Sequence, residues 1–202
     1  MLLPRKYYLS DDVLGLTRDI LGKMLVSQIQ GIRYSGIIVE AEAYRAPEDR
    51  ASHAFGNRLT PRTKTMFLDG GHAYIYVCYG IHEMFNIITG PIGTPHAILI
   101  RAVEPREGIA QMQKNRGISE APSALTKGPG CLTQAMGINR ALNACKLYEP
   151  ESPLQIHDIQ ITYNKAQIGQ SKRIGVESAG ESAQWLYRFY LKGNDYVSGS
   201  PR

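Results

Sequence analysis

Two glutamates and a tyrosine alternate with alanines in the segment IIVEAEAY, residues 37–44. If this segment is a β-strand, Glu40, Glu42 and Tyr44 share one face, because successive side chains point to opposite sides. The alanines on the other face suit close packing, so the carboxylates should face a cleft or solvent. A carboxylate in a cleft can act as general base toward water or stabilise positive charge developing at a sugar carbon. The alternative is an exposed edge strand with solvated glutamates.

A single arginine interrupts the apolar segment ILIRAVEP, residues 98–105. Burial of Arg101 in a strand is costly unless an acid pairs with it. A pair with Glu42 would keep that carboxylate ionised and hold an attacking water, whereas a purely structural ion pair needs the same partner. We therefore expect the loss of Arg101 to reduce both stability and activity.

Aromatic side chains could form a slot for a flat ring. Tyr44 and Tyr76 lie on predicted strands on either side of a polar loop, residues 45–65, that carries His53. A lone loop histidine is usually solvated, and with Glu48 and Asp49 nearby it could also be a metal ligand. No second histidine stands at a ligand spacing such as HxxxH, so we expect no metal site.

The segment HAYIYVCYGIHEMFNII, residues 72–88, predicts two strands that meet near Gly80. Strand alternation would direct Tyr76 to one face and Tyr79 to the other. Tyr76 can then line the slot, while Tyr79 at the edge of the hairpin could act as a wedge.

These residues must be positioned by a mixed set of elements. Strands are predicted at 23–29, 34–44, 72–88 and 96–105, and helices at 10–22, at 106–117 and after the glycine turn KGPG that begins at residue 127. Strands follow one another without regular β-α-β alternation, which favours an α+β fold over a doubly wound one. We see no repeat or linker, so the chain is expected to form a single domain over residues 1–202.

The composition restricts the class of protein. The net charge of +5 is compatible with a polyanionic partner, and the three widely spaced cysteines predict a reducing compartment. No apolar run approaches the roughly 20 residues of a membrane span. Pro4, Arg5 and Lys6 interrupt the place where a signal peptide would be apolar, so we expect a cytoplasmic protein.

Seven segments together resemble the alkyladenine (3-methyladenine) DNA glycosylase family. In order they are VEAEAY, PEDRASHA, TPRTKTMF, YIYVCYG, AILIRAVEP, KGPGCLTQAMGIN and the C-terminal pair RIGVESAG and RFYLKGNDYVS. The resemblance extends from about residue 10 to residue 198. It implies a compact α+β domain with a curved antiparallel sheet, a few helices and a protruding β-hairpin.

The resemblance also implies roles for individual residues. Glu42 would be the general base for water, and Arg101 would help to hold that water. The extruded base would be bound by Tyr44, His53 and Tyr76, and Tyr79 would enter the minor groove and fill the gap left by the flipped nucleotide. The remaining implied residue is Asn86, at the position that excludes the 2-amino group of normal guanine.

The activity implied is that of a monofunctional base excision repair enzyme. It would flip alkylated or deaminated purines (3-methyladenine, 7-methylguanine and also hypoxanthine or ethenoadenine) out of duplex DNA and hydrolyse the N-glycosidic bond. A 3-methyl- or 7-methylpurine is cationic and leaves without a proton, so cationic lesions are the expected substrates. We expect no cofactor and no lyase activity. The expected partner is damaged double-stranded DNA, bound by a monomer in the cytoplasm, on the nucleoid if the source is bacterial.

Two features depart from the family pattern. Cys131 stands where the family usually has a lysine or arginine, so Lys127 could supply that phosphate contact. The predicted hairpin tip carries Ile81, His82 and Glu83, and an acidic side chain near a phosphate backbone is unfavourable unless it turns away.

Three other functions remain possible from the sequence. A non-catalytic damaged-DNA-binding module would bind a lesion without releasing the base, and an interaction protein would not distinguish damaged from intact DNA. A metal-dependent nuclease would use the acidic residues and the histidine around the polar loop, namely Glu40, Glu42, Glu48, Asp49 and His53.

Overall fold

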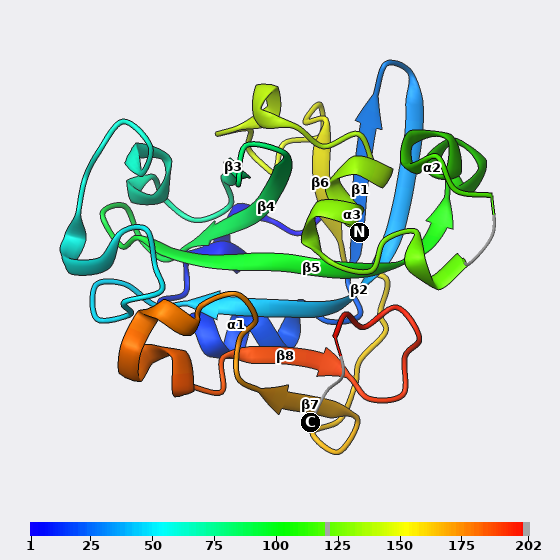
Figure 1. Ribbon diagram of the computed structural model, residues 1–202. Coiled ribbons are helices and arrows are strands. Elements are labelled where there is room, and N and C mark those ends of the chain that lie inside the picture. The colour runs from blue at the N-terminus through cyan, green and yellow to red at the C-terminus, as the bar shows by residue number, and fades with distance from the viewer. Residues whose placement is uncertain (120–121, 200–202) are drawn as a thin grey trace.

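A bent antiparallel sheet organises the chain (Figure 1), and the computed structural model describes residues 1–119 and 122–199. The strands are β1 (Met24–Ile29), β2 (Ile32–Tyr44), β3 (Ala73–Cys78), β4 (His82–Thr89), β5 (His96–Glu107), β6 (Leu154–His157), β7 (Ile168–Ser171) and β8 (Arg188–Leu191). Their order is β3-β4-β5-β2-β1-β6, with β8 added beside β2 and β7 beside β8. All of these pairings are antiparallel, which confirms the predicted α+β class.

Strand β2 lies inside the sheet and pairs with three other strands. Along one edge it pairs with β5, and along the other it pairs first with β1 through residues 32–37 and then with β8 through residues 40–42. The register with β5 shifts on both sides of Glu40, as at a β-bulge. Glu40 and Glu42 are completely buried. The interpretation of this segment as a solvated edge strand is therefore wrong.

Three α-helices cover the sheet: α1 (Val13–Asp19), α2 (Ile109–Arg116) and α3 (Pro129–Ala135). The helix predicted to begin at Ser10 begins instead after Asp12, whose carboxylate accepts a hydrogen bond from the backbone N–H of Gly15. Ser10 itself accepts from the backbone N–H of Asp12. The aspartate therefore takes the capping role because its side chain reaches the first turn directly.

Six short 3-10 helices complete the secondary structure of the described ranges. They are η1 (Arg5–Leu9), η2 (Phe55–Asn57), η3 (Lys64–Phe67), η4 (Pro122–Ala124), η5 (Arg140–Leu142) and η6 (Glu177–Gln184). Two of them, η2 and η3, lie in the polar segment between β2 and β3. That segment is therefore folded and not an extended loop.

Strand β5 continues to Glu107, past the proline that was expected to stop it. Pro105 lies opposite Gly36, where the register with β2 shifts between Ser35 and Gly36. Proline has no N–H to donate and is tolerated in sheets at such irregular positions. The helix α2 therefore begins later than predicted, at Ile109.

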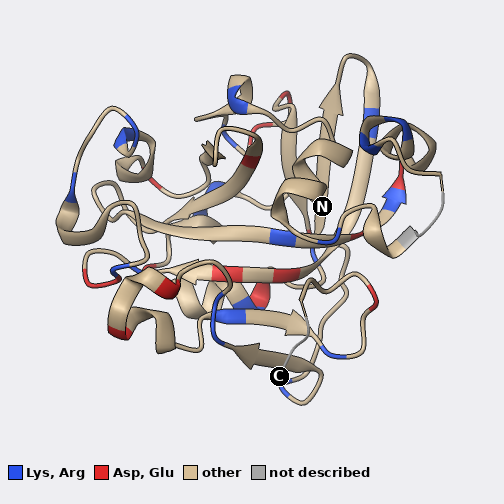
Figure 2. Ribbon diagram, viewed as in Figure 1, with Lys and Arg blue, Asp and Glu red and all other residues tan. Residues whose placement is uncertain are grey.

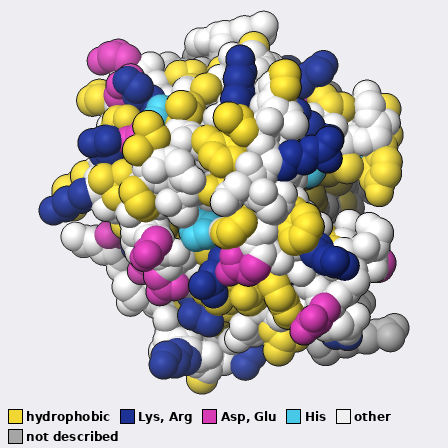
Figure 3. Space-filling model, turned by 90° about the vertical axis from the view of Figure 1, so that its left-hand side faces the viewer, with side chains coloured by type: hydrophobic (Ala, Val, Ile, Leu, Met, Phe, Trp, Pro, Cys, Tyr) yellow, Lys and Arg dark blue, Asp and Glu magenta, His cyan; other side chains and the backbone are white. Residues whose placement is uncertain are grey.

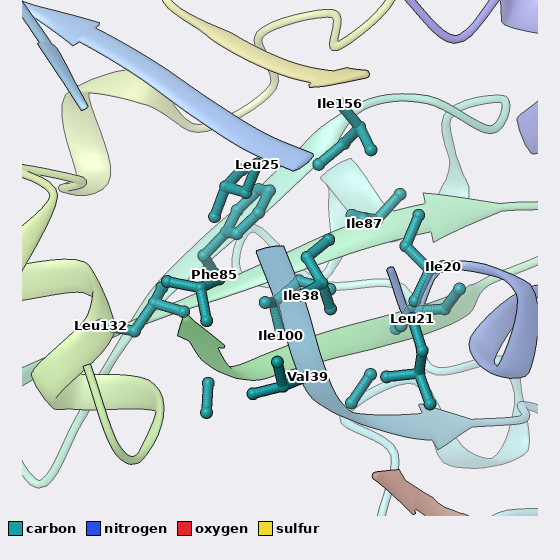
Figure 4. Close-up of a cluster of buried hydrophobic side chains, with 14 of the residues drawn as sticks. Ile20, Leu21, Leu25, Ile38, Val39, Phe85, Ile87, Ile100, Leu132 and Ile156 are labelled. Atoms are coloured by element: carbon teal, nitrogen blue, oxygen red, sulfur yellow. The ribbon is translucent and has the colours of Figure 1, made fainter. Parts of the chain in front are cut away.

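The main hydrophobic core lies between the sheet and the segments packed against it (Figure 4). Side chains from β1, β2, β4, β5 and β6 meet those from α3 and the chain after α1: Ile20, Leu21, Leu25, Ile38, Val39, Phe85, Ile87, Ile100, Leu132 and Ile156. A separate small cluster comprises Ala46, Ala54, Met66, Tyr74, Ile88 and Ala97 and packs against Tyr44, Phe67 and Tyr76. The aromatic side chains singled out in the sequence thus rest on a core of their own. Within residues 1–119 and 122–199, no helix is long and apolar enough to cross a membrane.

Candidate active site

Glu42 lies at the centre of the candidate site, on β2. Its Oε1 atom accepts a hydrogen bond from the backbone N–H of Ile174 at 2.8 Å and lies 3.2 Å from Nη1 of Arg101. Its Oε2 atom accepts from the hydroxyl of Tyr44 at 2.9 Å. A neighbour on β2, an arginine on β5 and a backbone N–H of the loop after β7 therefore hold this carboxylate in one orientation, as a group that must act on a single water molecule requires.

Arg101 contacts Glu42, but it is bound more closely by the other glutamate of β2. Its Nε atom donates to Oε1 of Glu40 at 2.7 Å, and Nη2 donates to the hydroxyl of Ser198 at 3.2 Å. Burial opposes the charge of Arg101, but the two carboxylates outweigh that cost and raise its pKa above the ordinary value. The sequence indicated an arginine–carboxylate pair, and the structure shows one arginine shared by two carboxylates.

A second arginine completes this buried network. Arg188, on β8, donates from Nε to Oε1 of Glu40 at 2.7 Å. The C-terminal segment closes the far side, where Ser198 donates to Glu40 from its backbone N–H at 2.6 Å and from its hydroxyl at 2.9 Å. We call Glu40, Glu42, Arg101 and Arg188 the carboxylate–arginine cluster. Figure 2 shows the acidic positions of β2 between the basic positions of β5 and β8.

An aromatic pocket lies beside the cluster. It is lined by Tyr44, Ala51, Ser52, His53, Met66, Tyr74, Tyr76, Asn86 and Ala97, and its free volume is about 20 Å³. Tyr44 joins the two parts, because its ring lines the pocket while its hydroxyl donates to Glu42. That volume holds about one water molecule and no aromatic ring. The pocket must therefore open before it can receive a base.

Both ring nitrogens of His53 have partners. Nδ1 lies 2.9 Å from the hydroxyl of Tyr74, and Nε2 lies 3.2 Å from Nη2 of Arg62. Because a guanidinium can only donate, Nε2 is the acceptor and the ring proton lies on Nδ1. Burial, aided by the charge of Arg62, lowers the pKa of His53 to about 4. His53 is thus a neutral, oriented wall of the pocket at neutral pH.

The other pocket residues are oriented by backbone and aromatic contacts. Tyr76 lies edge-on to His53, with 4.5 Å between the ring centroids. The side-chain amide of Asn86 donates to the carbonyl oxygens of Tyr74 and Met84 at 3.2 and 3.4 Å, so its nitrogen is used by the backbone. Burial and the charge of Glu42 raise the pKa of Tyr44 well above its usual value, so its hydroxyl stays protonated as a donor.

The arginine that packs against Tyr44 was not indicated by the sequence. Arg173 lies 4.7 Å from the centre of the Tyr44 ring and donates from Nη2 to Oδ1 of Asp49 at 2.8 Å. Both partners of this ion pair are completely buried. The segment RIGVESAG that contains Arg173 resembled the family, but nothing in its pattern indicated contact with Tyr44. Asp49, considered as a metal ligand, is instead the anchor of this arginine.

The acidic residues around the polar loop do not converge on one point. Glu48 pairs with Arg45 at 2.9 Å, Asp49 pairs with Arg173, and His53 is occupied as described above. Among the residues that the structure describes, no group of three His, Cys, Asp or Glu side chains could hold a metal ion.

Tyr79 projects from the turn between β3 and β4. The strand ends at Cys78, and Tyr79 and Gly80 both have positive φ angles, 51° and 76°. Tyr79 lies outside the strand, so the turn and not strand alternation, as predicted, sets the direction of its side chain. A tyrosine in left-handed conformation that is 90% exposed is unusual and suggests a functional constraint.

The remaining tip residues differ from one another in exposure. Ile81 is 74% exposed beside Tyr79, whereas Glu83 turns toward Arg140, with 3.5 Å between Oε1 and Nε. His82 lies against Gly130 at the start of α3, and Lys127 donates to the backbone carbonyl of Asp195 at 3.0 Å. The tip thus presents two exposed apolar side chains, and its acidic side chain is held to one side.

The chain is similar over nearly its whole length to known proteins of one family. The family model described as "Methylpurine-DNA glycosylase (MPG)" matches residues 7–195. A protein of Chlamydia abortus is 44% identical over 191 residues, covering 94% of this chain and 98% of that protein. Another from Bacillus cereus (strain G9842) is 40% identical over 205 residues, covering 98% and 99%. Both are named "Putative 3-methyladenine DNA glycosylase". A model match over nearly the whole length, with relatives this similar, means that the chain belongs to the methylpurine-DNA glycosylase family.

Proposed function

We propose that residues 1–202 form one DNA glycosylase domain that excises alkylated purines from duplex DNA by monofunctional hydrolysis. The observation that carries this proposal is the hydroxyl of Tyr44, which lines the aromatic pocket and donates to Glu42 at 2.9 Å. A base held against Tyr44 and Tyr76 would place its sugar next to an oriented carboxylate. A pocket without a carboxylate could bind a base but not activate water, and an ion pair without a pocket could not hold the base.

The proposed reaction uses one water molecule. Glu42 takes a proton from the water as its oxygen bonds to C1′ of the flipped nucleotide, and the bond from C1′ to N9 of the purine breaks with its electrons going to the base. A purine that is cationic through methylation leaves as a neutral molecule, so no acid is required. The carboxylate also stabilises the oxocarbenium character that develops at C1′. Arg101 contributes by holding Glu42 and the water.

The pocket walls suit a cationic base. Tyr44 and Tyr76 present aromatic rings, which attract a cation placed over their faces. His53 is neutral and adds no repulsive charge. We propose that Asn86 opposes the 2-amino group of guanine. Hypoxanthine and ethenoadenine, which are neutral, would depend on stacking alone and be excised more slowly.

The basic side chains are spread over the surface and are not gathered in a single charged patch. This distribution fits contact with the phosphate backbone of DNA. Figure 3 shows one face on which lysine and arginine side chains are interspersed with hydrophobic and acidic ones. Phosphate contacts position a protein on DNA without reading sequence, and they make binding depend on salt. Discrimination between damaged and intact DNA would then come from the pocket.

Tyr79→Ala is expected to weaken binding to a lesion-containing duplex by about tenfold, because the wedge that fills the gap in the base stack is lost. Release of the same lesion from single-stranded DNA should change less than twofold, since no gap has to be filled. Fluorescence anisotropy on both substrates and single-turnover release measure the two effects. Ile81→Ala at the same tip is the matched control. Equal losses on single and double strands would remove the wedge role from Tyr79.

The proposed function is tested by release of free bases from methylated duplex DNA with EDTA present. We expect 3-methyladenine to appear, followed by 7-methylguanine, with abasic sites left in an intact strand. Chromatography of the released bases and a strand-cleavage gel give the result. Strand breaks without free base would favour a nuclease, and tight lesion binding without release over hours would favour a binding module.

A further inference from the structure

Arg62 lies against two walls of the aromatic pocket. It extends from the loop between η2 and η3, and its guanidinium carbon lies 5.2 Å from the centre of the Tyr76 ring. Its Nη2 atom donates to Nε2 of His53 at 3.2 Å. Both contacts are with residues that line the pocket, yet Arg62 itself is exposed to solvent.

The space on the other side of Arg62 is much larger. A cavity of about 390 Å³ is lined by Arg50, Ser52, His53, Phe55, Arg58, Thr60, Arg62 and Thr63. It shares Ser52 and His53 with the aromatic pocket, whose free volume is only about 20 Å³. Arg62 therefore lines the larger cavity, together with Arg50 and Arg58, and contacts two walls of a pocket that is too small for a base.

We propose that Arg62 is a displaceable cap on the base pocket, which an extruded purine must replace before it can stack on Tyr76. This inference rests on the proposed function. In the free protein the guanidinium makes with Tyr76 the cation–aromatic contact that a methylated purine would make. A base enters only if its own contacts with the pocket are more favourable in free energy than the contacts of Arg62 that it replaces. Displacement of Arg62 costs the same for every base, so the cap lowers the occupancy of the pocket by all bases equally. Discrimination comes from the base itself, because a cationic lesion base restores the lost cation–aromatic contact and a normal purine does not.

The displaced side chain of Arg62 can be accommodated next to the pocket. Arg62 is an exposed side chain on a loop, and the adjoining cavity has room for it next to Arg50 and Arg58. The contacts of Arg62 with Tyr76 and His53 are then the ones that entry of a base must break.

The test measures base flipping apart from DNA affinity and apart from chemistry. All proteins carry Glu42→Gln so that no base is released, and each is added at saturation to a duplex with one fluorescent ethenoadenine. Stopped-flow rates for extrusion and return of the base give the flipping equilibrium on DNA that is already bound. Arg62→Leu removes the cap. Arg58→Leu is the matched control, because Arg58 lines the same cavity, whereas the cation–aromatic contact with Tyr76 and the hydrogen bond to His53 belong to Arg62.

We expect Arg62→Leu to raise the flipping equilibrium constant by about three- to fivefold, the size of one exposed cation–aromatic contact. Arg58→Leu should leave it unchanged, and Arg62→Lys should fall between Arg62→Leu and the parent. If Arg62→Leu behaves as Arg58→Leu does, or lowers the constant, Arg62 is a phosphate contact only and the cap is disproved. If the parent protein shows no lesion-dependent signal and the wild type releases no base, the proposed function itself fails.

Discussion

Glu42→Gln abolishes release of 3-methyladenine from methylated duplex DNA and leaves the fold intact. Loss of a positioned general base lowers rates by about 10²–10⁴-fold. The amide fits the site, because its oxygen can accept from Arg101 and from the N–H of Ile174 while its NH₂ group donates to the hydroxyl of Tyr44. The hydrogen bonds remain, but the negative charge and the proton acceptor are lost. Single-turnover release with EDTA present measures the effect.

The same variant must still bind a lesion-containing duplex and unfold in urea near the wild-type midpoint. Binding within about threefold of wild type would show that the loss lies in the chemical step, since a factor of three is well below 1 kcal/mol. A rate above one tenth of the wild-type rate would mean that Glu42 is not the base. A rate loss accompanied by an equal loss of binding would instead mean that the pocket has been disturbed.

Glu40→Gln, two residues away on the same strand, is expected to lower the free energy of unfolding by about 3 kcal/mol. Glu40 accepts from Arg101, Arg188 and Ser198, so the amide leaves two buried guanidinium groups with one charged carboxylate. The new NH₂ group would also face a donor, because Oε2 of Glu40 accepts from the backbone N–H of Ser198 at 2.6 Å. Urea denaturation followed by circular dichroism measures the loss.

Glu42→Gln is the matched control for this stability effect. It makes the identical chemical change on the same strand, and both glutamates are fully buried. We expect its unfolding free energy to fall by only about 1 kcal/mol, because Glu42 pairs with one arginine, Arg101, at 3.2 Å, whereas Glu40 accepts from both Arg101 and Arg188 at 2.7 Å. Equal stability losses in the two variants would contradict the assignment of Glu40 as the structural carboxylate and Glu42 as the reacting one.

Much of the site could be predicted from the sequence. The alternation of Glu40, Glu42 and Tyr44 along one strand gave their common face, because side-chain direction in a strand is a local property with a period of two. An arginine inside an apolar strand required a buried acid for the same kind of local reason. The α+β class followed from the order of strands and helices.

The tertiary structure alone decided which partners these residues have. Arg101 contacts Glu40 as well as Glu42, and Arg188 and Ser198 also bind Glu40. Ser198 is 158 residues from Glu40 in the chain. The burial of Asp49 against Arg173, and the contact of Arg62 with the ring of Tyr76, depend likewise on loops brought together by folding. Even Tyr79 owes its exposure to a turn and not to strand alternation. Periodicity reports the direction of a side chain along its own element, whereas an ion pair or a cap depends on distances between elements, and only packing of the whole chain determines those.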